Sequence, residues 1–196
     1  MKTAARGCSY DSAVGRGGDS TPARRSVSAV VSSGQAVIEN STRNSSNEEY
    51  EAKLKEKLLQ YKSQGVLSVV FGDIFLEDLR KYRENNLAQV GMKGIFPIWK
   101  RDTAELAHTF IDLDFKAVVT CVDSQSLDGK FVGKYFDNEF LSELPPKVDP
   151  CGENGEFHTF VYDGPIFGER IRFRRGKVVL RDNRFYFRDL IPFRKL

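Results

Sequence analysis

The chain has 196 residues, of which 40% are hydrophobic, with 30 Lys and Arg against 27 Asp and Glu. That length and composition suit one folded domain with a tail. The charge is uneven, because residues 1–47 carry six basic and three acidic residues while the remainder carries 24 of each, so the foldable part has no excess charge that would favour nucleic acid or a membrane surface.

The first 45 residues differ from all that follow. The stretch 1–47 holds ten Ser and five Gly, with Tyr10 as its one aromatic residue, so little apolar surface offsets the entropy of ordering it. We predict that residues 1–45 form a low-complexity, disordered segment, with short strands only at 27–31 and 36–38. An Arg- and Ser-rich, acid-poor composition leaves a targeting or anchoring role open as an alternative.

Order is expected from residue 46. Residues 46–49 read Ser-Asn-Glu-Glu, a capping box, and apolar side chains then recur at helical spacing up to Tyr61. Asp102 and Glu105 form a similar capping pattern at the start of a later helix. Short β-branched runs between the helices are typical of buried strands. The predicted helices cover 47–64, 77–89, 102–113 and 137–144, and the predicted strands cover 66–71, 95–96 and 116–122.

This alternation predicts an α/β fold with a parallel sheet over residues 46–148. After Gly155 the pattern changes to short strands separated by turn residues. We interpret residues 149–192 as a signature loop followed by an antiparallel β-meander docked on the α/β part. Its strands are predicted at 157–162, 170–175, 177–181 and 184–187, with turns at 174–177 and 182–183.

The remaining composition excludes several classes of protein. Cys8, Cys121 and Cys151 lie far apart, which predicts neither a disulfide framework nor a zinc site and favours a reducing, cytoplasmic setting. No apolar run approaches the roughly 18–20 residues that a membrane span needs. The N-terminus also lacks the apolar core of a secretory signal.

Several charged residues lie where ligands of α/β sheets bind, beyond the carboxyl ends of the strands. Asp73 follows a predicted strand, and Gly72 leaves room beside it, so a ligand role and a helix-capping role are both open. For Asp123, after the next long strand, we favour the cap. Arg101 can pair with a phosphate or carboxylate or remain solvated, and His108 is interpreted as structural.

A turn at residues 149–165 concentrates glycines, carboxylates, an amide and an imidazole directly before a strand. Glycine permits positive φ and a close approach of the backbone to a ligand, and the carboxylate and amide oxygens lie beside that backbone. A histidine there can transfer protons near neutral pH, although a polar turn before a strand is the alternative interpretation. The residues concerned are Gly152, Glu153, Asn154, Gly155, Glu156 and His158.

Four segments resemble, in the same order, motifs of the diphthine–ammonia ligase family, a branch of the PP-loop ATP pyrophosphatases. The resemblance extends from about Ser46 to Pro192, and the third segment is long and specific. The four segments are Val70–Asp78, Pro97–Asp102, Asp149–Glu156 running to Asp163–Pro165, and Arg181–Asp182.

The resemblance implies a Rossmann-like sheet of the adenine nucleotide alpha hydrolase type and a ligase that uses ATP with Mg. Such a ligase activates a carboxylate as an acyl-adenylate, and ammonia then attacks to form an amide. The implied partners are ATP, ammonium and a carboxylate acceptor, either diphthine on a translation elongation factor or an analogue, with a homodimer left open. The implied sites are catalytic Glu153, Asn154 and Glu156; substrate-binding Gly152, Gly155, His158, Thr159 and Arg101; and nucleotide-binding Gly72 and Asp73, with no metal ligand.

The N-terminal part departs from this family, whose PP-loop reads Ser-Gly-Gly-Lys-Asp-Ser after a first strand and cradles the ATP phosphates. Residues 17–20 read Gly-Gly-Asp-Ser, which lacks the Lys and lies too close to the helix at 47 for the missing units. We therefore expect the first βαβ unit to be absent and the parallel sheet to be truncated, with an exposed edge. The alternative function is a non-catalytic fragment or binding module that keeps only the acceptor-side pocket.

Overall fold

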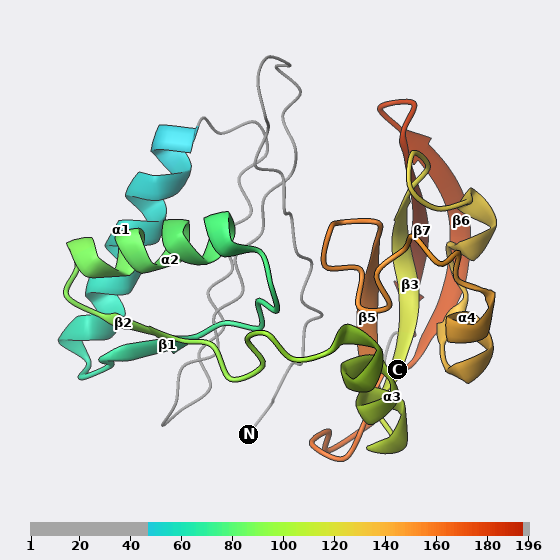
Figure 1. The fold of residues 1–196 in the computed structure, drawn as a ribbon, viewed down its shortest axis with the longest axis horizontal. Helices are drawn as coiled ribbons and strands as arrows, with labels where there is room; N and C mark the ends of the chain where they lie inside the picture. The colour runs from blue at the N-terminus through green and yellow to red at the C-terminus, as the bar shows by residue number, and fades with distance from the viewer. Residues whose placement is uncertain (1–46, 194–196) are drawn as a thin grey trace. The chain divides into compact units, whose positions relative to one another are not determined.

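The computed structural model describes residues 47–193, and these form two compact units that meet in the sequence between Arg101 and Asp102 (Figure 1). Each unit is described separately. The expectations for residues 1–45 and for the Ser46 cap lie outside the described residues.

The first unit is a small α/β layer. Its strands β1 and β2 pair in parallel, with Val69 opposite Gly94, and helices α1 and α2 pack beside them (Figure 1). Its core consists of Leu58, Val69, Phe71, Leu87, Val90 and Met92. The elements are α1 (Asn47–Ser63), β1 (Ser68–Val70), α2 (Glu77–Gln89) and β2 (Lys93–Ile95).

Parallel pairing and the position of both helices agree with the α/β prediction for this part of the chain. Gly65 has a φ of 89° and lets the chain leave α1, as expected for a glycine that follows a helix. With two strands, the sheet is too small to confirm the Rossmann-like topology. The confirmed statement is therefore that the first unit is α/β with a parallel strand pair.

The second unit is built on an antiparallel sheet. Strand β3 lies in its middle: one edge pairs with β5, and the other pairs with β4 at its start and with β7 at its end. Strand β6 pairs with β7 and ends the sheet. The elements are α3 (Thr103–Asp112), β3 (Lys116–Asp123), the 3₁₀ turn η1 (Gly129–Phe131), β4 (Tyr135–Phe136), α4 (Asn138–Glu143), β5 (Phe157–Asp163), β6 (Phe173–Arg181) and β7 (Phe185–Pro192).

The prediction that a parallel sheet continues to residue 148 was therefore wrong for strand β3, because all three partners of β3 are antiparallel to it. The physical reason is burial. Residues Ala117, Val118 and Val119 are all almost fully buried, so both faces of β3 are covered. A centrally placed antiparallel strand then has the same continuous apolar sequence as a parallel one.

The prediction of an antiparallel β-meander after residue 149 was also partly wrong. Residues 174–177 do not turn; they lie inside β6, where the register with β7 shifts between Arg175 and Val178, and Gly176 occupies this bulge. Strand β5 pairs with β3 rather than with β6. The turn at Asp182 and Asn183 is confirmed, since both have positive φ of 52° and 49°, the left-handed conformation that tight hairpin turns need.

A cluster of buried aromatic and aliphatic side chains holds α3, η1 and α4 against the antiparallel sheet. Phe140 of α4 lies at its centre, with ring contacts to Phe131, Phe136 and Phe157. All members lie between residues 107 and 157, so this core belongs to the second unit alone. Among the helices of residues 47–193, none has the length and hydropathy required to cross a bilayer.

Candidate functional site

The loop at residues 149–156 joins α4 to β5 and is organised by the carboxylate of Asp149. One oxygen of that carboxylate, Oδ1, accepts the backbone N–H groups of Cys151 at 2.9 Å and Glu153 at 3.1 Å. The carbonyl of Asp149 accepts the N–H of Gly152 at 2.9 Å. An aspartate that folds the following backbone around itself is a local turn device, which explains why the sequence turns sharply here.

Both glycines of the loop have backbone conformations that other residues rarely adopt. Gly152 has a φ of 69° and Gly155 a φ of 86°. A Cβ at Gly152 would lie 2.8 Å from the carbonyl oxygen of Phe157, so a side chain there would force the loop away from β5. The glycines therefore shape the turn; contact with a substrate remains a prediction.

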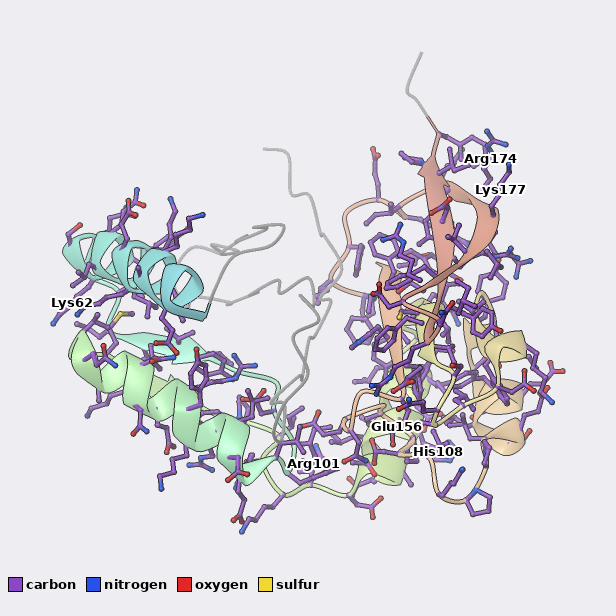
Figure 2. All side chains as sticks on the ribbon, turned by 90° about the horizontal axis from the view of Figure 1, so that it is seen from above. Lys62, Arg101, His108, Glu156, Arg174 and Lys177 are labelled. Atoms are coloured by element: carbon purple, nitrogen blue, oxygen red, sulfur yellow. The ribbon has the colours of Figure 1, made fainter. Side chains whose placement is uncertain are left out.

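The loop buries one carboxylate, that of Glu156, which is 5% exposed. Its Oε1 accepts the backbone N–H of Asp149 and the side-chain amide of Asn154, each at 3.0 Å. The other oxygen, Oε2, is buried and has no hydrogen-bond partner among the described residues. No described Lys, Arg or His forms an ion pair with it. Figure 2 labels Glu156 in the second unit.

The burial of Glu156 has an energetic consequence. A carboxylate removed from water is strongly disfavoured unless hydrogen bonds or an opposite charge compensate it. Two donors satisfy Oε1, and no protein group satisfies Oε2 in the part of the chain that the structure describes. A positively charged or hydrogen-bond-donating group at Oε2 would compensate this carboxylate oxygen.

Cys151 fastens the loop to helix α3. Its thiol donates a hydrogen bond to the carbonyl oxygen of Thr103 at 3.2 Å. Burial, followed by the negative charges of Asp149, Glu153 and Asp102, raises the pKa of the Cys151 thiol to about 12. The thiol is therefore protonated near neutral pH, and Cys151 lacks the thiolate that a nucleophilic cysteine requires.

His158 and Thr159 follow the loop on β5. Burial lowers the pKa of the His158 imidazole, so the ring is neutral at neutral pH. The carbonyl of His158 accepts the hydroxyl of Thr120 at 3.2 Å, and Thr159 is the register partner of Val119. Both side chains are half-buried, and their proposed contact with the acceptor stays a prediction.

Asp123 and Arg184 form an ion pair next to the end of the loop. The sequence analysis did not predict this pair. The backbone N–H of Asp123 donates to the carbonyl of Glu156 at 2.9 Å. Its carboxylate accepts the N–H of Gln125 at 3.0 Å within a turn, and not at the start of a helix as the capping prediction expected, and it also binds the guanidinium of Arg184 through both oxygens. Because the partners lie 61 residues apart, no local pattern reveals the pair.

The remaining predicted site residues belong to the first unit. Asp73 is fully buried, and both of its oxygens accept hydrogen bonds from Arg83, at 2.6 and 3.1 Å. Gly72 is exposed, and so is Arg101, the last residue of the unit. Asp73 thus serves the interior of the first unit and has no open oxygen as it stands.

Two further observations limit the chemistry. His108 is exposed on α3, where Figure 2 labels it. In residues 47–193 no group of three or more His, Cys, Asp or Glu side chains is arranged to hold a metal ion. The candidate site therefore consists of the 149–156 loop with its buried carboxylate.

Comparison with known proteins places this loop in a family. The family described as "Diphthamide synthase C-terminal domain" matches residues 102–188, which lie within the second unit. A diphthine–ammonia ligase of Bos taurus is 30% identical over 128 residues, covering 63% of this chain and 48% of the relative. The Homo sapiens enzyme of that name is 32% identical over 111 residues, covering 54% and 42%. The Danio rerio one is 33% identical over 102 residues, covering 49% and 40%.

Residues 102–188 therefore match the diphthamide synthase C-terminal domain, and the chain is similar to diphthine–ammonia ligases, in agreement with the resemblance that the sequence motifs carry. It spans about half the length of the curated relatives that it matches.

Proposed function

We propose that this chain takes part in an ATP-dependent, amide-forming reaction of the diphthine–ammonia ligase type, with the 149–156 loop binding the ammonia donor. The observation that carries the proposal is the buried carboxylate of Glu156, whose Oε2 has no protein partner among the described residues. An ammonium ion supplies both the positive charge and the N–H donors that this oxygen lacks.

The chemistry requires ammonium to lose a proton before its nitrogen can attack an activated carboxylate. In this proposal Glu156 Oε2 holds the ammonium and takes one proton from it, which frees ammonia to attack the acyl-adenylate. The C–N bond then forms as the bond from the carbonyl carbon to the AMP oxygen breaks, AMP leaves, and a second proton passes from the nitrogen to water. Asn154 keeps the carboxylate oriented through Oε1. Glu153 is the second carboxylate at the ammonia end, and Gly152, Gly155, His158 and Thr159 are proposed to contact the acceptor. The assignment of Arg101, a residue of the first unit, to the acceptor stays a separate prediction.

ATP would supply the activation of the acceptor carboxylate by forming an acyl-adenylate. The described residues do not fit Mg²⁺ at Asp73, because that carboxylate is buried and engaged by Arg83. The assignment of Gly72 and Asp73 to the nucleotide therefore stays a prediction, and no step is derived through it. The acceptor class, diphthine on a translation elongation factor or an analogue, likewise belongs to the proposal, as do a homodimer and a cytoplasmic setting.

Ammonium binding can be tested without turnover by thermal unfolding. A ligand that binds only the folded state raises its stability, by about 1.4 kcal/mol at ten times its dissociation constant. We expect ammonium chloride to raise the Tm by several degrees more than sodium chloride at equal ionic strength. Glu156→Gln keeps the acceptor at Oε1 but replaces Oε2 by an amide, so it should abolish the difference.

The matched control is Glu139→Gln, which changes an exposed carboxylate on α4 of the same unit. It should retain the full ammonium effect. An ammonium effect that persists in Glu156→Gln would contradict the proposed site.

The alternative function is a non-catalytic binding module that keeps only the acceptor-side pocket. Calorimetric titration with Mg²⁺-ATP separates the two functions. Saturable binding, followed by AMP release in the presence of ammonium and an acceptor, would support the ligase. An absence of heat at millimolar ATP would exclude it and leave the binding module. If ATP binds, Glu153→Gln should lose amide formation and keep its nucleotide affinity.

A further inference from the structure

Strand β6 is the open edge of the antiparallel sheet in the second unit. It has nine residues, pairs with β7 alone and ends the order β4-β3-β7-β6. Val178, Val179 and Leu180 are 44%, 37% and 45% exposed, although they occupy successive positions and so face both sides of the sheet. An exposed edge with apolar side chains can pair with a further strand.

The same hairpin carries a strong positive charge. Residues 170–188 include eight Lys and Arg and one acidic residue, Asp182. Arg170 pairs with Asp163, and Arg184 pairs with Asp123. Six other basic side chains form no ion pair within residues 47–193: Arg172, Arg174, Arg175, Lys177, Arg181 and Arg188. Figure 2 shows Arg174 and Lys177 well apart from Glu156.

The charges discriminate between the chains that could cover this edge. Proteins place like charges on an edge strand to prevent copies from pairing with each other. Basic side chains on β6 oppose pairing with a second copy of β6, whereas they attract a strand of opposite charge. Charge complementarity thus selects an acidic strand and disfavours self-association.

A nucleic acid fits the hairpin less well than a polypeptide. Binding of single strands relies on aromatic faces on which bases stack. Two aromatic rings of β7 already contact arginines. The guanidinium of Arg181 lies 4.8 Å from the centroid of the Phe187 ring, and that of Arg184 lies 4.9 Å from the centroid of the Phe185 ring. The apolar run Val178–Leu180 and the unpaired backbone of the edge instead suit main-chain hydrogen bonds with a strand.

We propose that the edge of β6 binds an extended acidic segment of a partner protein, which adds a strand to the sheet. Backbone hydrogen bonds supply affinity, and Val178, Val179 and Leu180 contact apolar side chains of the segment. The basic side chains of β6 that form no ion pair among the described residues, Arg174 and Lys177 among them, select its acidic residues. This surface is distinct from the 149–156 loop and does not depend on the proposed ligase function.

The test uses the full chain and a fluorescein-labelled ten-residue peptide of alternating Glu and Val. Fluorescence anisotropy should show saturable binding that weakens with salt, because exposed charges are screened. A peptide with Lys in place of Glu should not bind. The Glu–Val peptide with N-methyl groups at alternate backbone positions keeps its charge and loses donors, so it should bind at least roughly tenfold more weakly.

Charge reversal on the protein provides the matched comparison. Lys177→Glu on β6 should weaken binding of the Glu–Val peptide by roughly fivefold, since it replaces attraction by repulsion. Lys147→Glu, at an exposed lysine in the loop after α4, should change it less than twofold. Amide hydrogen exchange at residues 178–180 should slow when the peptide is bound.

Three results would overturn the proposal. Equal affinity for the N-methylated peptide would show attraction without strand pairing. Unchanged exchange on β6 would place the peptide elsewhere. Tighter binding of a single-stranded oligouridylate than of the acidic peptide, lost in Lys177→Glu, would assign the surface to nucleic acid.

Discussion

Single residues of the 149–156 loop have separable roles. Asp149 gathers backbone N–H groups, the glycines permit the path, and Glu156 buries a carboxylate with one open oxygen. The sequence predicted a polar turn with these residue types. It could not predict that Glu156 rather than Glu153 is buried, because this depends on Asp123 of a strand 33 positions earlier, whose N–H binds the Glu156 carbonyl.

Gly152→Ala should destabilise the loop. The positive φ of 69° disfavours a side chain, and the added Cβ would lie 2.8 Å from the Phe157 carbonyl. We expect a loss of about 1–3 kcal/mol in the free energy of unfolding, measured by urea denaturation. Gly168→Ala is the control, since a Cβ there meets nothing within 4 Å. Equal losses in both variants would contradict a strained path at Gly152.

His158 should make stability depend on pH. Its pKa is lowered in the folded chain, so below the ordinary value near 6.5 the unfolded chain binds a proton that the folded chain does not. Stability should therefore be retained above that value and fall as the pH decreases through it, with a slope of at most about 1.4 kcal/mol per pH unit. His158→Gln should flatten this part of the profile of unfolding free energy. His108→Gln, on the surface of α3, should leave the profile unchanged.

At the scale of elements, capping residues and hydrophobic periodicity predicted the helices, whereas they did not predict how the strands pair. Asp102 and Asp137 cap α3 and α4 through the N–H groups of Glu105 and Phe140, at 2.8 and 2.9 Å, and α2 was predicted with its observed bounds. The predictions of parallel partners for β3 and of a turn at residues 174–177, where the structure has a bulge at Gly176, were wrong. Caps act within one turn of helix, whereas the direction of a partner strand is decided by distant packing.

The Asp123–Arg184 pair should stabilise the β6–β7 hairpin on β3. Removing the guanidinium leaves a buried carboxylate, which is 7% exposed, without its main counter-charge. Because Arg184 is partly exposed, we expect Arg184→Met to cost about 1–3 kcal/mol of unfolding free energy. Arg172→Met, at an exposed arginine without an ion pair among the described residues, should cost less than about 0.5 kcal/mol. Similar losses in the two variants would show that the pair is unimportant.

For the whole molecule, the separate cores of the two units are the decisive feature. Every member of the second core lies between residues 107 and 157, and every member of the first lies between 58 and 92. The sequence suggested a change of pattern near residue 149. The contacts instead divide the described chain after Arg101, since α3 and β3 pack into the antiparallel part.

A chain comprising residues 102–196 should therefore fold alone. Its core and all five strands of its sheet are contained within it. We expect a cooperative thermal transition in circular dichroism and dispersed amide signals in nuclear magnetic resonance. A fragment with unfolded spectra would show that residues 47–101 are required to stabilise the second unit.

The hydrogen bond from Cys151 to Thr103 makes this cysteine a natural reporter of loop opening. Its thiol should react faster with an alkylating reagent when the loop leaves α3, because burial in the closed state raises the pKa of the thiol to about 12. When opening and closing are fast, the alkylation rate is proportional to the fraction of molecules with an open loop. Peptide mapping that follows Cys151 separately from Cys8 and Cys121 would thus measure local opening beside Glu156.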